Sequence, residues 1–207
     1  MAGEESTHPS YETLTEDQAG RILAGMNEVI RAGEEMRQLR TEMVQVLAGL
    51  GWSQSRIARL TEMSQPAVSK QVAKHGGDPQ PPLDVSLDQH DPPWLEGRLW
   101  GLAEEVSEAL DGAAHCTGHV TALARGRRRL TPQGVDELRR LLEADLRAHR
   151  AQLPGSHRAA YDAIGRALDV PTKAAATATT SASVRRTLAR QIQRDHLRED
   201  ASGSTRN

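Results

Sequence analysis

The sequence predicts an all-α protein, and three observations support this fold class. The 207-residue chain has no phenylalanine and only 2% aromatic residues, so its core must be built from aliphatic side chains, which suit helices better than sheets. Apolar residues recur at helical spacing, and no segment has a convincing strand pattern. The expected parts are a disordered N-terminus (1–14), a helical domain (15–75), a linker (76–93), a second helical domain (94–170) and a low-complexity tether with a C-terminal helix (171–207).

The first helical domain opens with two apolar runs at helical spacing. One run extends from Ala19 to Ile30 and the other from Met36 to Leu50. Gly33 either divides them into two helices or lies within one long helix. Gly51 then suits a left-handed helix end.

Residues 52–72, WSQSRIARLTEMSQPAVSKQV, have the pattern of two short helices that cross at a fixed angle. Ser53 and Ser64 are placed to cap the two helices, and Pro66 suits the first turn of the second. The small Ala58 allows a close crossing. The expected core of the pair is Ala58, Met63 and Val68, with Ile57, Leu60, Val72 and Trp52 also turned inward. The residues expected to face outward are Gln65, Ala67, Ser69, Lys70 and Gln71.

Residues 76–93 read as a linker because they hold five prolines and two glycines. After them, apolar residues alternate in steps of four and three, which places them on one seam of a helix: Leu95, Leu99, Leu102, Val106, Ala109, Ala113, Cys116, Val120 and Leu123. Such a seam is typical of a coiled coil between two copies of the chain. The alternative is that it packs against the chain's own later helices. The residues assigned to a dimer seam are Leu95, Leu99, Leu102, Val106, Val120 and Leu123.

Three further helices are expected towards the C-terminus. Thr131 and Pro132 have the types of an N-cap and a first helical residue, and this helix is expected to end at Pro154 and Gly155. Ser156 is then placed to cap a shorter helix. Residues 172–183 form a flexible tether or a weak helix, and a final amphipathic helix covers about residues 184–197.

Composition limits the class of protein. No run of 18 apolar residues occurs and no secretory signal is visible, so we expect a cytoplasmic protein without a membrane partner. The single Cys116 fits a reducing compartment. The net charge of −2 is segmented: −5 over residues 1–50, +3 over 51–77, −8 over 78–111 and +8 over 112–207. A phosphate backbone senses the local +3 segment more than the total charge, because salt screens charges beyond roughly 8 Å.

The stretch SRIARLTEMSQPAVSKQV resembles the trihelical helix-turn-helix of bacterial DNA-binding regulators, especially the homeodomain-like and sigma-factor-like modules common in actinobacteria. The resemblance covers about residues 36–75. One departure is Glu62, which occupies the left-handed turn position where the family usually has glycine. A side chain there costs about 1 kcal/mol. The resemblance implies a nucleoid-associated protein that binds double-stranded DNA.

The resemblance also implies roles for individual residues, with the second helix of the pair in the major groove. The implied base-contacting residues are Gln65, Ala67, Ser69 and Lys70. The implied phosphate-contacting residues are Ser53, Gln54, Arg56, Arg59, Ser64 and Lys74. One such head cannot supply genome-wide specificity, so we expect a homodimer, held together by the seam that starts at Leu95 or by the helix from Ala19 to Ile30.

Other signals are weaker. His115, Cys116 and His119 lie close together, but no companion ligands stand out, so we expect no metal and no cofactor. The run ARGRRR over residues 124–129 fits either a phosphate grip or a solvated turn. No catalytic motif is present, and we expect no enzyme.

Three interpretations remain: a transcriptional regulator, a plasmid, phage or chromosome maintenance protein, and a helical adaptor that binds protein. Residues 94–207 are the part of the chain that could bind a protein or small-molecule partner, which the sequence does not identify.

Overall fold

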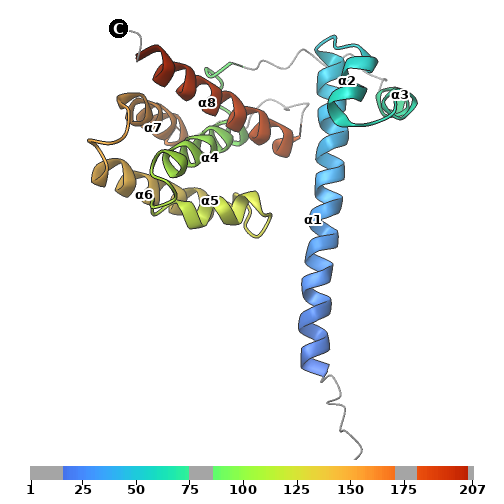
Figure 1. Ribbon diagram of the computed structural model, residues 1–207, viewed down its shortest axis with the longest axis horizontal. Coiled ribbons are helices and arrows are strands. Elements are labelled where there is room, and N and C mark those ends of the chain that lie inside the picture. Colours follow the sequence, from blue (N-terminus) through green and yellow to red (C-terminus); the bar gives the residue numbers. More distant parts are fainter. Residues whose placement is uncertain (1–15, 75–85, 171–180, 205–207) are drawn as a thin grey trace, which may run out of the picture. The chain divides into compact units, whose positions relative to one another are not determined.

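The described part of the chain is helical, as predicted. The computed structural model describes residues 16–74, 86–170 and 181–204, and within its first helix it describes side chains only at residue 30 and from residue 33 onward. These ranges contain no strand (Figure 1). The helices are α1 (Glu16–Gly49), α2 (Gln54–Thr61), α3 (Gln65–Lys74), α4 (Pro92–Ala109), α5 (Thr117–Ala124), α6 (Pro132–Ala148), α7 (Gly155–Leu168) and α8 (Ala182–Ser204). The predicted disordered N-terminus, most of the linker and most of the tether lie outside the described residues.

Helix α1 is continuous through Gly33, so the alternative of two separate helices is wrong. After it ends at Gly49, Gly51 takes the predicted left-handed conformation with φ +79°. The backbone N–H of Trp52 donates to the carbonyl oxygen of Leu47 at 3.1 Å, which closes the helix end. In the described residues, no helix combines the length and the apolar character that crossing a lipid bilayer requires.

The C-terminal part of α1 shares a small apolar core with α2 and α3. Val44, Ile57, Ala58 and Val68 are buried in it, and Met63 packs against them half-buried. Leu60, which was expected to face inward, is 58% exposed. At 100° per residue it is turned about 110° from the middle of the face formed by Ile57 and Ala58, so it cannot reach the core.

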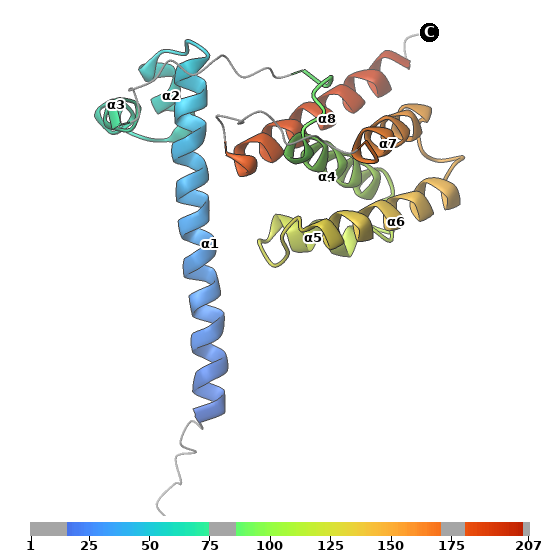
Figure 2. The same cartoon turned by 180° about the vertical axis from the view of Figure 1, so that it is seen from behind.

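The remaining helices form a bundle around α4. Helices α5, α6, α7 and α8 all pack against α4 (Figures 1 and 2). Its apolar cluster of buried side chains draws on all five helices, through Leu99 of α4, Val120 of α5, Leu138 of α6, Ile164 of α7 and Leu197 of α8.

The predicted seam from Leu95 to Leu123 does not lie on one helix. Helix α4 ends at Ala109, and Asp111 and Gly112 follow with φ of 50° and 78°, both left-handed. Two successive left-handed residues turn the chain, and α5 begins only at Thr117. The residues assigned to a dimer seam are all buried within the chain: Leu95, Leu99, Leu102, Val106, Val120 and Leu123. The coiled-coil interpretation is therefore wrong, and the alternative of packing against the chain's own helices is confirmed.

Several helix boundaries also differ from expectation. The predicted linker runs two residues too far, because Pro92 already begins α4 and Asp91 caps it by accepting from the Trp94 N–H at 3.3 Å. Thr131 caps α6 as predicted, with its hydroxyl accepting from the Gly134 N–H at 3.1 Å. Helix α6 ends at Ala148, well before Pro154, since the chain forms turns over residues 149–153. Ser156 lies inside α7 and does not cap it.

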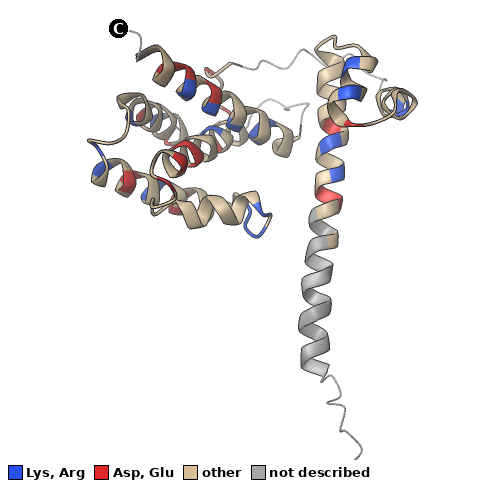
Figure 3. Ribbon diagram, viewed as in Figure 1, with Lys and Arg blue, Asp and Glu red and all other residues tan. Residues whose placement is uncertain are grey.

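Helices α4 and α8 make the closest crossing in the bundle. A Cβ atom added to Gly97 or Gly101 would lie nearer than 3.0 Å to the carbonyl oxygen of Arg186 or Arg190, so only glycine fits at either position. Carboxylates of α4 and of its N-cap pair with arginines of α8 along this crossing, and Figure 3 shows red and blue positions on these two helices. The ion pairs join Arg185 to Asp91, Arg186 to Glu96, Arg190 to Glu104, Arg194 to Glu104, Glu105 and Glu108, and Arg198 to Glu105 and Glu108.

These pairs, here called the α4–α8 ladder, account for part of the charge segmentation along the sequence. Five of the nine acidic residues of 78–111 meet five of the seventeen basic residues of 112–207 in this one intramolecular interface. A buried polar contact lies within the same crossing, where Arg98 Nε donates to Gln193 Oε1 at 2.9 Å. Burial lowers the pKa of Arg98, and Asp88 opposes this shift.

Candidate nucleic-acid interface

The start of α2 is fixed by a local cap. Ser53 has an extended backbone, with φ −67° and ψ 144°, and its hydroxyl accepts a hydrogen bond from the Arg56 N–H at 3.3 Å. This is the N-cap that the sequence predicts. Ser53 is itself exposed, so the N-terminal end of α2 is open to solvent at this residue.

The turn between α2 and α3 has the geometry that the sequence predicts. Glu62 is left-handed, with φ 55° and ψ 34°. The N–H groups of Glu62 and of Met63, the latter at 3.0 Å, both donate to the carbonyl oxygen of Ala58. The Ser64 hydroxyl then accepts from the Ala67 N–H at 3.4 Å and caps α3. The two hydrogen bonds to the Ala58 carbonyl oxygen thus tie the end of α2 to the turn that leads into α3.

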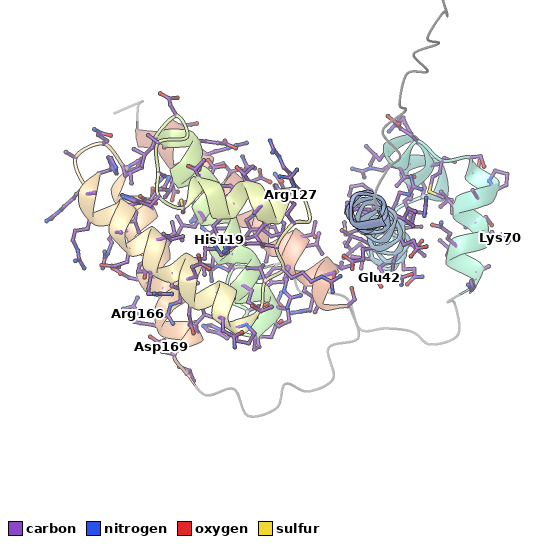
Figure 4. All side chains as sticks on the ribbon, turned by 90° about the horizontal axis from the view of Figure 1, so that it is seen from below. Glu42, Lys70, His119, Arg127, Arg166 and Asp169 are labelled. Atoms are coloured by element: carbon purple, nitrogen blue, oxygen red, sulfur yellow. The ribbon has the colours of Figure 1, made fainter. Side chains whose placement is uncertain are left out.

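Helix α3 is buried on one side and open on the other. Val68 is fully buried, whereas Gln65 and Lys70 are exposed. Figure 4 shows Lys70 on the outer side of the helix. The other two residues assigned to base contacts, Ala67 and Ser69, are half-buried, as is Gln71. The polar side of α3 is therefore exposed at Gln65 and at Lys70 and half-buried at the other assigned positions.

The residues assigned to phosphate contacts lie on both helices of the pair. Ser53, Arg56, Arg59, Ser64 and Lys74 are exposed and Gln54 is half-buried. Over residues 51–74 the chain carries four cationic side chains, at Arg56, Arg59, Lys70 and Lys74, against the single carboxylate of Glu62. Basic positions accordingly outnumber acidic ones on the pair, and Figure 3 shows blue positions on both helices.

Arg56 has a contact that the sequence reasoning missed. Its guanidinium carbon lies 3.7 Å from the centre of the Trp52 ring, so the two groups are stacked. Trp52 precedes the N-cap and lies outside α2, so the spacing rule for helix neighbours gave no signal for this contact. Arg56 covers Trp52, and a substitution there would alter packing as well as charge.

His115, Cys116 and His119 of the bundle do not share one partner, because the first two contact Asp145 and the third contacts Arg128. The buried carboxylate of Asp145 accepts from the N–H of His115 at 2.8 Å and of Cys116 at 3.0 Å, and it lies 2.6 Å from His115 Nδ1. His119 instead lies 3.0 Å from Arg128. The described residues hold no group of three side chains arranged to bind a metal. Asp145 was not singled out from sequence, because it lies about thirty residues from its partners.

Burial perturbs the pKa values of this group. Burial raises the pKa of Cys116, and its hydrogen bond and charge interaction with Asp145 raise it further. For Asp145 itself, burial raises the pKa, but the hydrogen bonds from Cys116 and His115 together outweigh it and the pKa is lowered. Burial lowers the pKa of His119. These shifts favour a neutral Cys116 thiol, a neutral His119 imidazole and a charged Asp145 carboxylate.

The pair α2–α3, with its uncovered polar face and cationic surface, is the candidate site of this chain. Comparisons of the chain with protein-family models, with curated proteins and with solved structures find no match.

Proposed function

We propose that this chain is a sequence-specific double-stranded DNA-binding protein that acts as a transcriptional regulator, with α3 in the major groove. The observation that carries the proposal is the exposure of Gln65 and Lys70 on the polar face of α3. The opposite face of this helix is held in the core by the buried Val68. The capped turn and the surrounding cations support the same conclusion.

The side chains on that face have the chemistry of base recognition. The Gln65 amide can pair with the N6 and N7 atoms of adenine, and the Lys70 ammonium can donate to the O6 and N7 atoms of guanine. Ala67 offers a methyl group to thymine and Ser69 a hydroxyl to any base, although both are half-buried and reach less far. Each good contact contributes about 1–3 kcal/mol of discrimination between bases.

The surrounding groups would fix the register on the DNA backbone. The exposed N-terminus of α2, with Ser53 and Gln54, presents N–H groups to a phosphate. Arg59, Ser64 and Lys74 add further donors on the same pair of helices. Arg56 would reach a phosphate from its stacked position on Trp52.

We further propose that α1 holds two copies together, since the seam that starts at Leu95 is occupied by the chain's own core. The sequence places apolar residues at helical spacing from Ala19 to Ile30, and α1 spans 34 residues. Ile30 and Met36 are 57% and 62% exposed. A second α1 is the partner that would cover such a stripe and supply the second reading head.

The decisive experiment is enrichment of random double-stranded DNA on the full chain, followed by sequencing. The enriched motif is then located in genomic DNA. Isolated inverted repeats near promoters would support a regulator, arrays of repeats would indicate a maintenance protein, and the absence of any enriched motif would overturn DNA reading in favour of an adaptor. Replacing Gln65 and Lys70 by Ala should relax the sequence preference. The matched variant Arg59→Ala should weaken binding to all sequences equally.

The dimer has its own measurement. Sedimentation at micromolar concentration should give twice the chain mass for the wild type and the single mass for Ile30→Glu, because a charge would face the apolar stripe of the second copy. Leu60→Glu is the control, since this exposed residue lies on α2 and outside the stripe. A wild-type protein of single mass with an unchanged DNA footprint would contradict the proposal.

A further inference from the structure

We propose that the loop joining α5 to α6, residues Arg125 to Arg129, is a second contact of this protein with the phosphate backbone of DNA. The inference rests on the proposed function, because it adds a sequence-independent contact to the reading head. The loop has the sequence RGRRR, and all four arginines in it are exposed. Figure 3 shows the loop as a blue turn, and Figure 4 marks Arg127 on it.

Charge pairing across the bundle singles out this loop. Five arginines of α8 are engaged in the α4–α8 ladder, and Arg139, Arg147 and Arg158 are paired with Asp169 and Glu143. These eight are among the seventeen basic residues after residue 112, and their charge is paired with carboxylates of the same chain. The loop has the densest run of exposed cations in the bundle, with four arginines in five residues.

Within the loop, the arginines differ in how free they are. Across the ranges that the structure describes, the side chains of Arg125 and Arg127 form no ion pair and no hydrogen bond. Arg128 is held between Glu137 Oε2 at 2.7 Å and His119 Nδ1 at 3.0 Å. Arg125 and Arg127 are thus the two guanidinium groups available to a phosphate, and each offers the planar fork that binds phosphate oxygens in pairs.

The backbone of the loop is already ordered. Gly126 is left-handed, with φ 67°, and its N–H donates to the Leu123 carbonyl oxygen at 3.0 Å. The N–H groups of Arg127 and Arg128 both donate to the Ala122 carbonyl oxygen, at 2.8 and 3.1 Å. This is a Schellman-type end of α5. Because these bonds fix the turn before any ligand arrives, little backbone entropy would be lost on binding.

The loop and the reading head belong to one chain, so a contact that is weak by itself adds to the affinity of the head. Side chains that touch only phosphates carry no sequence information. The expected effect is therefore on overall affinity and its salt dependence, and not on which sequence is preferred.

The test compares two variants of the full chain that lose the same charge. One is Arg125→Gln with Arg127→Gln. The control is Arg140→Gln with Arg166→Gln, which removes two exposed arginines of α6 and α7 that make no ion pair within the described chain. Circular dichroism establishes that both are folded. Binding of a fluorescent duplex that carries the enriched site is then measured against salt concentration.

Each lost phosphate contact should reduce the slope of log affinity against log salt by about 0.9. The loop variant should therefore lose about 1.8 of slope for each protomer bound, so that for each protomer its affinity falls about tenfold less than that of the wild type between 50 and 200 mM salt. The control should keep the wild-type slope. The charge-conserving variant Arg125→Lys with Arg127→Lys should also keep it.

The outcomes separate the two proposals. If the wild type binds DNA and the loop variant has the same slope as the control, the loop inference is overturned while the reading head stands. If the loop variant changes which sequence is preferred, a pure backbone role is overturned. If the wild type binds no DNA, or binds single-stranded RNA in preference, both the loop inference and the proposed function fail.

Discussion

Replacing Gly101 by alanine should loosen the bundle at its closest crossing. The added methyl group would lie nearer than 3.0 Å to the carbonyl oxygen of Arg190, which is a backbone atom and cannot rotate away. Helix α8 would have to move off α4. A radial gap of roughly 0.5–1 Å forfeits a quarter to a half of the dispersion energy across an interface, and the buried side chains of Ala189, Gln193 and Leu197 lie on α8.

The expected magnitude follows from two opposing effects. Overpacking of a core by one methyl group lowers stability by about 1–3 kcal/mol, and a rigid backbone neighbour places this site near the upper end. Alanine in place of glycine within a helix returns about 1 kcal/mol. The free energy of unfolding of the bundle should therefore fall by about 2 kcal/mol.

Urea unfolding followed by tryptophan fluorescence measures this change. The chain has three tryptophans, and a Trp52→Phe background leaves only Trp94 and Trp100, which both lie on α4. Gly118→Ala is the matched control, since an added Cβ there has no neighbour within 4 Å, and it should raise stability by about 0.5–1 kcal/mol. If Gly101→Ala were as stable as this control, the close crossing of α4 and α8 would be refuted.

Three further predictions concern single residues. Asp145→Asn should lower the free energy of unfolding by about 2–3 kcal/mol at pH 7, because the buried N–H of Cys116 and the partly buried N–H of His115 lose a charged acceptor. Since the folded-state pKa of Asp145 is lowered, its contribution is present above the unfolded value of about 3.9 and is lost as pH falls below it, so the wild type and variant should converge in urea titrations at acid pH. Glu62→Gly should raise the unfolding free energy of the α2–α3 unit by about 1 kcal/mol in thermal unfolding, because glycine adopts the left-handed conformation without strain; an unchanged midpoint would contradict this. Cys116 should react with a thiol reagent at pH 8 only in denaturant, because burial raises its pKa, and rapid labelling of the native protein would show that the site is open.

Features with local causes were predictable from the sequence. The caps at Ser53 and Ser64 depend on residues within a few positions of one another, and both are observed. The left-handed Glu62, which the family resemblance implied, is observed as well. The helical class follows from an aliphatic composition with helical periodicity. The exposure of Gln65 and Lys70 could also be inferred, because the spacing of Ala58 and Val68 fixes which side of α3 is buried.

Features with distant causes were not predictable. Apolar periodicity continues through Asp111 and Gly112, although the backbone reverses there, because spacing carries no information about the sign of φ. The Asp-Gly dipeptide was the local signal for that turn. The α4–α8 ladder joins residues about ninety positions apart, so the segmental charges were visible while their pairing was not.

The position of α8 at the end of the bundle has a consequence for how the protein is made. Its partner α4 leaves the ribosome roughly ninety residues earlier, with its row of carboxylates and its two glycines still facing water. During that interval α5, α6 and α7 can fold locally, but the central helix has no cover on one side. Completion of the bundle therefore waits for α8, and the nascent chain is exposed to chaperones and proteases until that helix emerges.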